Sequence, residues 1–142
     1  VGTGLAGVAV LVIARLASGI FGWRETRLAE RLIPTTPAER STFAFASCVS
    51  GAGEELAYRG FLLSLLVATF DAAWIAVLVS SLAFAILHAY QGPLGIVRTA
   101  VIGVIFAWAV LATGSVWPVV VGHIIINGVA GLVLGRWLLQ RD

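Results

Sequence analysis

Apolar residues dominate five stretches of the chain, which short polar or Gly/Pro segments separate. The stretches run over Thr3–Gly22, Thr42–Phe70, Ala72–Tyr90, Leu94–Ala112 and Trp117–Leu139. At roughly 20 residues, a helix is long enough to cross a bilayer. The pattern therefore predicts an all-α fold, a polytopic transmembrane helical bundle with about five spans. In the charged linker after the first stretch, Arg24 to Ile33 predicts a short interfacial helix that ends before Pro34.

The composition favours lipid rather than water around these helices. Of the 142 residues, 60% are hydrophobic and 11% are charged, and the mean hydropathy is +1.02. A soluble domain of this length needs more polar side chains to cover its core. We therefore expect one membrane-embedded domain over residues 1–142, with the chemistry in residues 53–128. Because the chain starts at Val1 and contains no Met, we also expect further helices before it.

The arginines lie in alternate loops of the predicted bundle. The turns at Asp71 and at Thr113–Ser115 have none, whereas the other loops and the C-terminal end contain Arg24, Arg27, Arg31, Arg40, Arg98, Arg136 and Arg141. Positive residues favour the cytoplasmic side. Together with an Ala-, Val-, Gly- and Arg-rich composition, this predicts a bacterial inner-membrane protein whose first residues lie outside and whose C-terminus is cytoplasmic. The net charge of +2 is too small and too scattered to indicate a nucleic-acid partner.

Several ionisable side chains fall within the predicted helices, where each costs about 2.5–3.5 kcal/mol on insertion scales. They are Arg15, Glu54, Glu55, Arg59, His88 and His123. Glu55 and Arg59 are four residues apart, so an ion pair on one helix face is expected. Glu54 is rotated by about 100° from Glu55 and has no cation of its own. A purely structural ion pair accounts for Glu55 and Arg59, but it leaves Glu54 unexplained.

Both histidines of the chain belong to spaced polar motifs. Phe84 and His88 share one helix face, and so do His123 and Asn127. One histidine in a spanning helix often makes only an interhelical hydrogen bond. Since Glu54, the two histidines and Asn127 occupy three separate helices, we expect them to line one polar cavity. The glycines near these motifs, Gly51, Gly53, Gly122, Gly128 and Gly131, are typical of close helix approach.

If the predicted helices are straight, the two histidines lie at different depths in the membrane. Counting at about 1.5 Å per residue separates His88 from His123 by more than about 10 Å along the membrane normal. The two side chains meet if helices tilt, if the third helix continues towards Gln91, or if the segment before Trp117 dips inward.

The motifs Glu54-Glu55-x-x-x-Arg59, Phe84-x-x-x-His88 and His123-x-x-x-Asn127, in this order on successive apolar helices, resemble the CPBP family. This family is also called Abi, and it includes type II CAAX prenyl endopeptidases and bacteriocin-processing proteins. The resemblance covers Glu54 to Asn127, roughly half the chain. It implies a membrane-embedded hydrolase, namely an intramembrane endopeptidase.

The resemblance also implies roles for these residues. Glu54 is the expected base that activates water, His88 helps to hold that water, and His123 and Asn127 stabilise the oxyanion. Glu55, Arg59 and Phe84 support the site. Members are often labelled metalloproteases, and Glu54, His88 and His123 could hold Zn²⁺. We favour a site with no obligatory metal, because the chain contains no His-Glu-x-x-His helix.

Two other functions remain open from the sequence. A non-catalytic bacteriocin-immunity or peptide-binding scaffold would use the same cavity for recognition alone. An ion or proton carrier would use the glutamate and histidines as a relay, but such carriers are typically built from repeats, and the chain shows none. The expected partners are a peptide or protein substrate and membrane lipid; the sequence leaves the substrate and the oligomeric state open.

Overall fold

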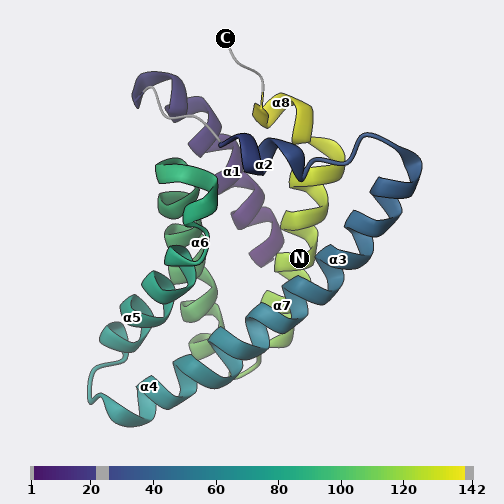
Figure 1. Cartoon of the computed structure of the whole chain (residues 1–142). Helices are drawn as coiled ribbons and strands as arrows, with labels where there is room; N and C mark the ends of the chain where they lie inside the picture. Colours follow the sequence, from purple (N-terminus) through teal and green to yellow (C-terminus); the bar gives the residue numbers. More distant parts are fainter. Residues whose placement is uncertain (1, 22–25, 140–142) are drawn as a thin grey trace.

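The computed structural model describes residues 2–21 and 26–139, and all regular secondary structure in these two ranges is helical (Figure 1). The predicted all-α class is therefore confirmed. Val1, residues 22–25 and residues 140–142 lie outside the described part of the chain. Expectations for Gly22, Arg24 and Arg141 therefore fall outside the described residues.

The first two apolar stretches form long helical runs. The first is α1 (Gly2–Phe21). The second is a continuous run of α3 (Pro37–Glu55), the π-helix η1 (Leu56–Leu62) and α4 (Leu63–Thr69). It begins five residues before the predicted Thr42, because Thr36 and Glu39 form a capping box around Pro37 in the first turn. Sequence hydropathy did not reveal this start, since the first turn is polar.

The third stretch is shorter than predicted. Helix α5 (Ala73–Ile86) ends before His88, and the 3₁₀ segment η2 (Ala89–Gln91) leads directly into α6 (Gly92–Thr113). Gly92, with a φ of 83°, makes the reversal between them, and Gly114, with a φ of 64°, ends α6. The prediction that the third helix extends to Tyr90 is therefore wrong.

The last stretch is divided into α7 (Trp117–Gly128), the π-helix η3 (Val129–Val133) and α8 (Gly135–Leu139). The predicted interfacial helix corresponds to α2 (Arg27–Arg31), which Thr26 caps by accepting a hydrogen bond from the Ala29 backbone. It is one short turn of helix and contains no fully buried residue.

The long helical runs alternate in direction (Figure 1). The turns near Asp71 and Gly114 lie towards one end of the molecule, and α2, η2 and α8 lie towards the other. Helix α5 packs mainly on α6, and α7 packs on both α1 and α3. One core cluster joins α1, α6 and α7 through Leu11, Phe106 and Val119. A second cluster joins α4, α5 and α6 around Leu63 and Val77.

Glycines allow α7 to approach two neighbours closely. A Cβ on Gly122 would lie 2.5 Å from Thr3 Oγ1 on α1, and a Cβ on Gly51 would lie 3.3 Å from the Ile124 backbone nitrogen. Gly131 likewise lies under the Phe43 ring. The expectation of close approach is wrong for Gly53 and Gly128, because a Cβ at either position would meet nothing within 4 Å.

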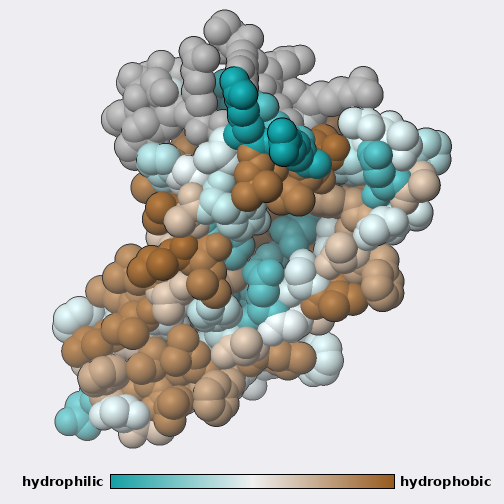
Figure 2. All heavy atoms as spheres, in the orientation of Figure 1, coloured by the Kyte–Doolittle hydropathy of each residue, from teal (hydrophilic) through white to brown (hydrophobic). Residues whose placement is uncertain are grey.

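Large apolar side chains cover much of the outer surface. Phe45, Phe61, Trp74 and Val133 are all more than half exposed, and Figure 2 shows brown atoms over most of the lower part of this face. Of the described helical segments, Ala89–Thr113 is the one that is long and apolar enough to cross a membrane by itself. Shorter apolar helices cover Gly2–Ser18, Ala73–Ile86 and Trp117–Val133.

Candidate active site

A cavity of about 320 Å³ contains all four residues that the sequence grouped together, Glu54, His88, His123 and Asn127. Their side chains come from α3, the turn after α5, and α7. The opposite part of the cavity wall is apolar and comes from α1, α2 and the segments around η3. In Figure 2, hydrophilic side chains gather in a hollow at the centre of the molecule, surrounded by apolar atoms. The structure therefore brings the predicted polar residues to one cavity.

Glu54 lies between the two histidines. Its Oε2 is 3.8 Å from Nε2 of His88 and 3.8 Å from Nε2 of His123. This oxygen is buried and has no hydrogen-bond partner among the described residues, although 33% of the Glu54 side chain is exposed. The two rings reach the same oxygen, so the histidines meet despite the depth difference that straight helices would impose. Helix α5 ends at Ile86, so it does not continue past His88 towards Gln91 as an α-helix.

Glu55 joins two groups that the sequence assigned to different motifs. Its Oε1 accepts a hydrogen bond from Arg59 Nη1 at 3.1 Å, which confirms the predicted ion pair. The same oxygen lies 2.7 Å from His123 Nδ1. Glu55 is fully buried and Arg59 is 1% exposed. Since an ionised carboxylate can only accept, His123 carries a proton on Nδ1 and turns Nε2 towards Glu54.

His88 is oriented by the helix that precedes it. Its Nδ1 lies 2.9 Å from the Phe84 carbonyl oxygen, and the Phe84 ring lies 4.7 Å from the imidazole, centroid to centroid. A carbonyl oxygen only accepts hydrogen bonds, so Nδ1 carries the proton. In the neutral ring, Nε2 then has a lone pair, and this atom faces Glu54. The predicted contact between Phe84 and His88 is present even though His88 lies beyond the end of α5.

Phe84 contacts three of the polar groups around it. The Arg59 guanidinium lies 4.2 Å from the centroid of its ring, a distance at which a cation is attracted to the ring face. The His123 ring lies 5.9 Å away on another side. Phe84 is 2% exposed. It therefore separates the buried ion pair from His88 while contacting both.

Asn127 lies one helical turn after His123 on α7 and lines the same cavity. It also lines a second, smaller cavity of about 110 Å³, together with His88 and His123. The two isoleucines next to it in the sequence differ in environment: Ile126 belongs to the core cluster, whereas Ile125 is 36% exposed. The spacing from His123 to Asn127 therefore directs both polar side chains to the cavity, as the motif predicts.

A π-helix adjoins two of the motifs. The π-helix η1 begins at Leu56, after the glutamate pair, and contains Arg59, whereas η3 begins at Val129, two residues after Asn127. A π-turn widens the helix and rotates the residues that follow it, and such turns are frequent at functional sites. Hydropathy carries no signal for this change of helix type, so the sequence did not predict it.

The fit of the site to a metal ion is poor. In residues 2–21 and 26–139, no three His, Cys, Asp or Glu side chains are grouped so that they could hold a metal. The separations of 3.8 Å around Glu54 are also wider than the roughly 3.3–3.4 Å between ligands in a tetrahedral zinc site with bonds of about 2.0–2.1 Å.

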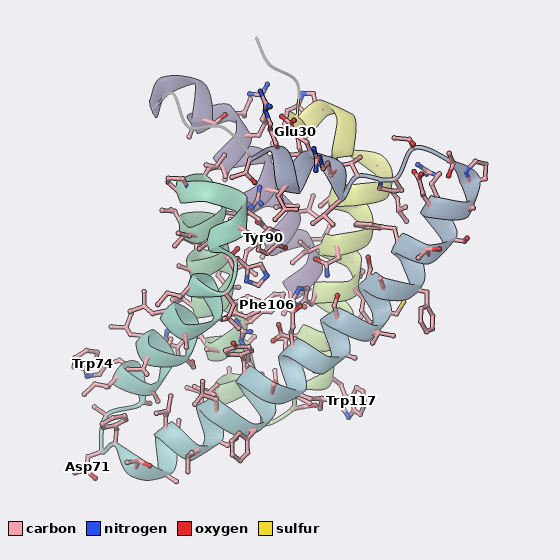
Figure 3. The ribbon with its side chains drawn as sticks, viewed as in Figure 1. Glu30, Asp71, Trp74, Tyr90, Phe106 and Trp117 are labelled. Atoms are coloured by element: carbon pink, nitrogen blue, oxygen red, sulfur yellow. The ribbon has the colours of Figure 1, made fainter. Side chains whose placement is uncertain are left out.

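Sequence reasoning missed five polar residues of the cavity, Ser47, Ser50, Tyr90, Gln91 and Arg98. Tyr90 and Gln91 follow His88 closely, and this polar pair in an otherwise apolar region is a signal that could have identified them. Arg98 was taken as a loop charge, but it lies in the second turn of α6. Figure 3 shows Tyr90 and Phe106 in the interior of the view, whereas Trp74 and Trp117 point outward.

Comparison with known proteins identifies the family. A family model described as Type II CAAX prenyl endopeptidase Rce1-like matches residues 37–129, which is more than half of the chain. No curated protein and no solved structure matches the chain. The family consists of membrane-integral proteases, which act on peptides or proteins. The resemblance that the three motifs indicated is therefore confirmed, and the chain belongs to the Type II CAAX prenyl endopeptidase Rce1-like family.

Proposed function

We propose that this chain is an intramembrane endopeptidase that hydrolyses a peptide bond with water activated by Glu54. The observation that carries the proposal is the position of Glu54 Oε2, 3.8 Å from Nε2 of both His88 and His123, in one cavity. These separations are longer than a hydrogen bond. They are short enough for one water molecule to bond to the carboxylate and to one of the rings.

In the proposed first step, Glu54 takes a proton from the water, and the oxygen of that water attacks the carbonyl carbon of the peptide bond. Nε2 of His88 accepts a hydrogen bond from the same water and orients it. The tautomer set by the Phe84 carbonyl supports this role, because it leaves the Nε2 lone pair facing Glu54.

The attack places a negative charge on the former carbonyl oxygen. Donors aimed at this oxygen lower the barrier because they are already in place when the charge develops. We assign this role to His123 Nε2–H and the Asn127 side-chain amide. The carboxylate of Glu55, 2.7 Å from His123 Nδ1, stabilises the protonated ring that such donation requires. In the second step, Glu54 returns its proton to the leaving amine as the C–N bond breaks.

We also propose that the chain crosses the membrane as a polytopic bundle of about five spans, with α2, η2 and α8 on the cytoplasmic side. The alternating direction of the helical runs supports this topology (Figure 1), as does the apolar outer surface. A bacterial inner membrane fits the distribution of arginines.

Cleavage by the purified protein in proteoliposomes tests the activity. We expect Glu54→Gln to lower the rate by at least about 10²-fold, as loss of a general base does. Asp71→Asn is the matched control, because Asp71 is an exposed carboxylate outside the cavity. Unchanged cleavage by Glu54→Gln would contradict the mechanism. Binding of a peptide without any hydrolysis by the wild-type protein would instead favour a non-catalytic scaffold.

A further inference from the structure

The face of α3 that lines the cavity carries two serines that the proposed mechanism does not use. Phe43, Ser47, Ser50 and Glu54 all contribute to the cavity wall. Because an α-helix turns by about 100° per residue, these four positions lie within an arc of about 60° on α3. Ser47 and Ser50 therefore extend the line of the candidate base towards the start of the helix.

The hydroxyls of Ser47 and Ser50 are not used within the protein. Earlier on the same helix, Ser41 and Thr42 each donate to the Ala38 carbonyl oxygen, which is a common arrangement for a hydroxyl in a helix. The side chains of Ser47 and Ser50 form no hydrogen bond with the described residues, although Ser47 is only 5% exposed. Because a buried hydroxyl without a partner costs free energy, this arrangement points to a ligand in the cavity.

Packing alone does not account for the two serines. Helix α3 lies against α7, and the short distances at Gly51 show that this contact needs small residues. Alanine is as small as serine, has a higher helix propensity and buries no polar group. A role in packing therefore leaves both hydroxyls unexplained, whereas a role in binding requires them.

The chemistry of the cavity walls favours the main chain of a peptide as the ligand of the serines. A hydroxyl both donates and accepts, so it can pair with either a carbonyl oxygen or an amide N–H, and its lack of charge gives no advantage to an ion. The rest of the wall includes the apolar side chains of Leu11, Leu32, Ile33, Ala130 and Leu138. A peptide in the cavity therefore satisfies its main chain at α3 and places apolar side chains against the other wall.

The spacing of the serines matches an extended peptide. A rise of about 1.5 Å per residue places Ser50 about 6 Å and Ser47 about 10 Å from Glu54 along the axis of α3. An extended chain rises about 3.3 Å per residue, and the N–H and C=O of one residue point to the same side. The two hydroxyls can therefore reach both main-chain groups of a single residue, at about two or three positions from a peptide bond at Glu54.

We propose that Ser47 and Ser50 bind the main-chain N–H and C=O of one substrate residue and hold the substrate in an extended conformation along α3. The inference rests on the proposed peptidase function and deepens it by specifying how the substrate is held. Because the contacts involve only the main chain, they select no side chain at that position, but they require an amide N–H there.

Replacing single amide bonds of a substrate by ester bonds tests the contact. Degenerate apolar dodecapeptides are incubated with the protein in proteoliposomes, and mass spectrometry identifies a cleaved sequence and its cleavage position. Esters are then introduced into that peptide one at a time, at every bond except the cleaved one, and each ester removes one N–H. For the wild-type protein, we expect kcat/KM to fall about three- to tenfold for the ester at one position, two or three residues from the cleaved bond, as the loss of one hydrogen bond implies.

Serine variants identify the partner of that N–H. The double variant Ser47→Ala/Ser50→Ala should lower kcat/KM for the all-amide peptide by about tenfold and should lose the sensitivity to the ester at that position. Ser64→Ala in α4, on the same helical run, is the matched control, because Ser64 is exposed and outside the cavity. It should keep both the rate and the sensitivity to the ester. If the double variant does not fold, the single variants Ser47→Ala and Ser50→Ala are measured instead, and one of them should lose the sensitivity.

The contact and the peptidase function can fail separately. A double variant with the kcat/KM of the wild-type protein, or one that stays sensitive to the same ester, overturns the serine contact and leaves the peptidase function intact. Equal cleavage of every ester peptide by the wild-type protein overturns the contact as well. If the folded wild-type protein cleaves no peptide of the library, the proposed function fails and this inference fails with it.

Discussion

The Glu55 carboxylate on α3 lies 2.7 Å from His123 Nδ1 on α7, and it also binds Arg59. One buried oxygen thus connects the first and last motifs of the chain. Removing one partner of a buried ion pair commonly costs about 3–5 kcal/mol, because the other charge stays uncompensated. The Glu55 carboxylate is therefore expected to matter both for stability and for the orientation of His123.

For the ion pair, we expect Glu55→Gln and Arg59→Leu each to lower the free energy of unfolding by about 3–5 kcal/mol. The double variant should lose less than the sum, because neither charge is then left alone. Unfolding in mixed detergent micelles, followed by circular dichroism, measures the cycle. Additive losses would mean that the two side chains act independently.

Close packing of α3 on α7 is expected to make Gly51 intolerant of substitution. A Cβ there would lie 3.0 Å from Ile124 Cγ1 and 3.3 Å from the Ile124 backbone nitrogen. Gly51→Ala should therefore destabilise the protein by about 1–3 kcal/mol, as overpacking does, and lengthen the contact from Glu55 to His123. Gly53→Ala on the same helix is the control, since its Cβ meets nothing within 4 Å. Equal melting temperatures for the two variants would refute the packing argument.

Phe84 is expected to act on the site through its ring. Phe84→Leu removes the face on which the Arg59 guanidinium lies, at 4.2 Å, and the ring that contacts His88. We expect a loss of about 1–2 kcal/mol in stability, from the cation–π contact and the lost packing, and a lower rate of peptide cleavage. Ile86→Ala on the same helix is the control, because Ile86 is 65% exposed. A Phe84→Leu variant with the stability of the wild-type protein would contradict this prediction.

The start of α3 is expected to weaken in acid. Hydrogen bonds from the Thr35 backbone and hydroxyl, followed by those from Thr36, hold the pKa of Glu39 below its ordinary value of 4.5. A lowered folded-state pKa means that the ionised form binds more strongly in the folded protein. Its contribution is therefore complete above about pH 4.5 and is lost as the pH falls through the lower folded-state pKa. The protection factors of the amides of residues 38–40, which are corrected for the intrinsic exchange rate at each pH, should fall over this acidic range in the wild-type protein. In Glu39→Gln this fall should be absent.

Local patterns explain how much of the fold was predictable. The five predicted apolar stretches correspond to five helical runs, because the length and periodicity of apolar residues along the sequence predict a helix locally. The exceptions are two helix ends and the two π-helices. The start at Pro37 depends on a polar capping box, and the end of α5 at Ile86 depends on a turn that positions His88. The two π-helices have no hydropathy signal.

The sequence predicted most of the ionisable residues that line the candidate site, but fewer of the contacts between them. Buried ionisable side chains are costly in an apolar helix, so Glu54 and the histidines stood out from their neighbours. The ion pair between Glu55 and Arg59 followed from their separation of four residues. Their catalytic and supporting roles remain predictions. Arg98 was missed because a single arginine near a helix end looks the same in sequence whether it faces a loop or a cavity.

By itself, the sequence determined the helical class, the apolar stretches and the residues able to carry chemistry, because these depend on local hydropathy and on spacing within one helix. Tertiary structure alone decided which of those residues meet. The contact between Glu55 and His123 joins residues of separate helices, and it depends on the approach of α3 to α7 at Gly51. The meeting of His88 and His123 at Glu54 depends on where α5 ends. Such contacts follow from helix packing, which the spacing along one helix does not determine.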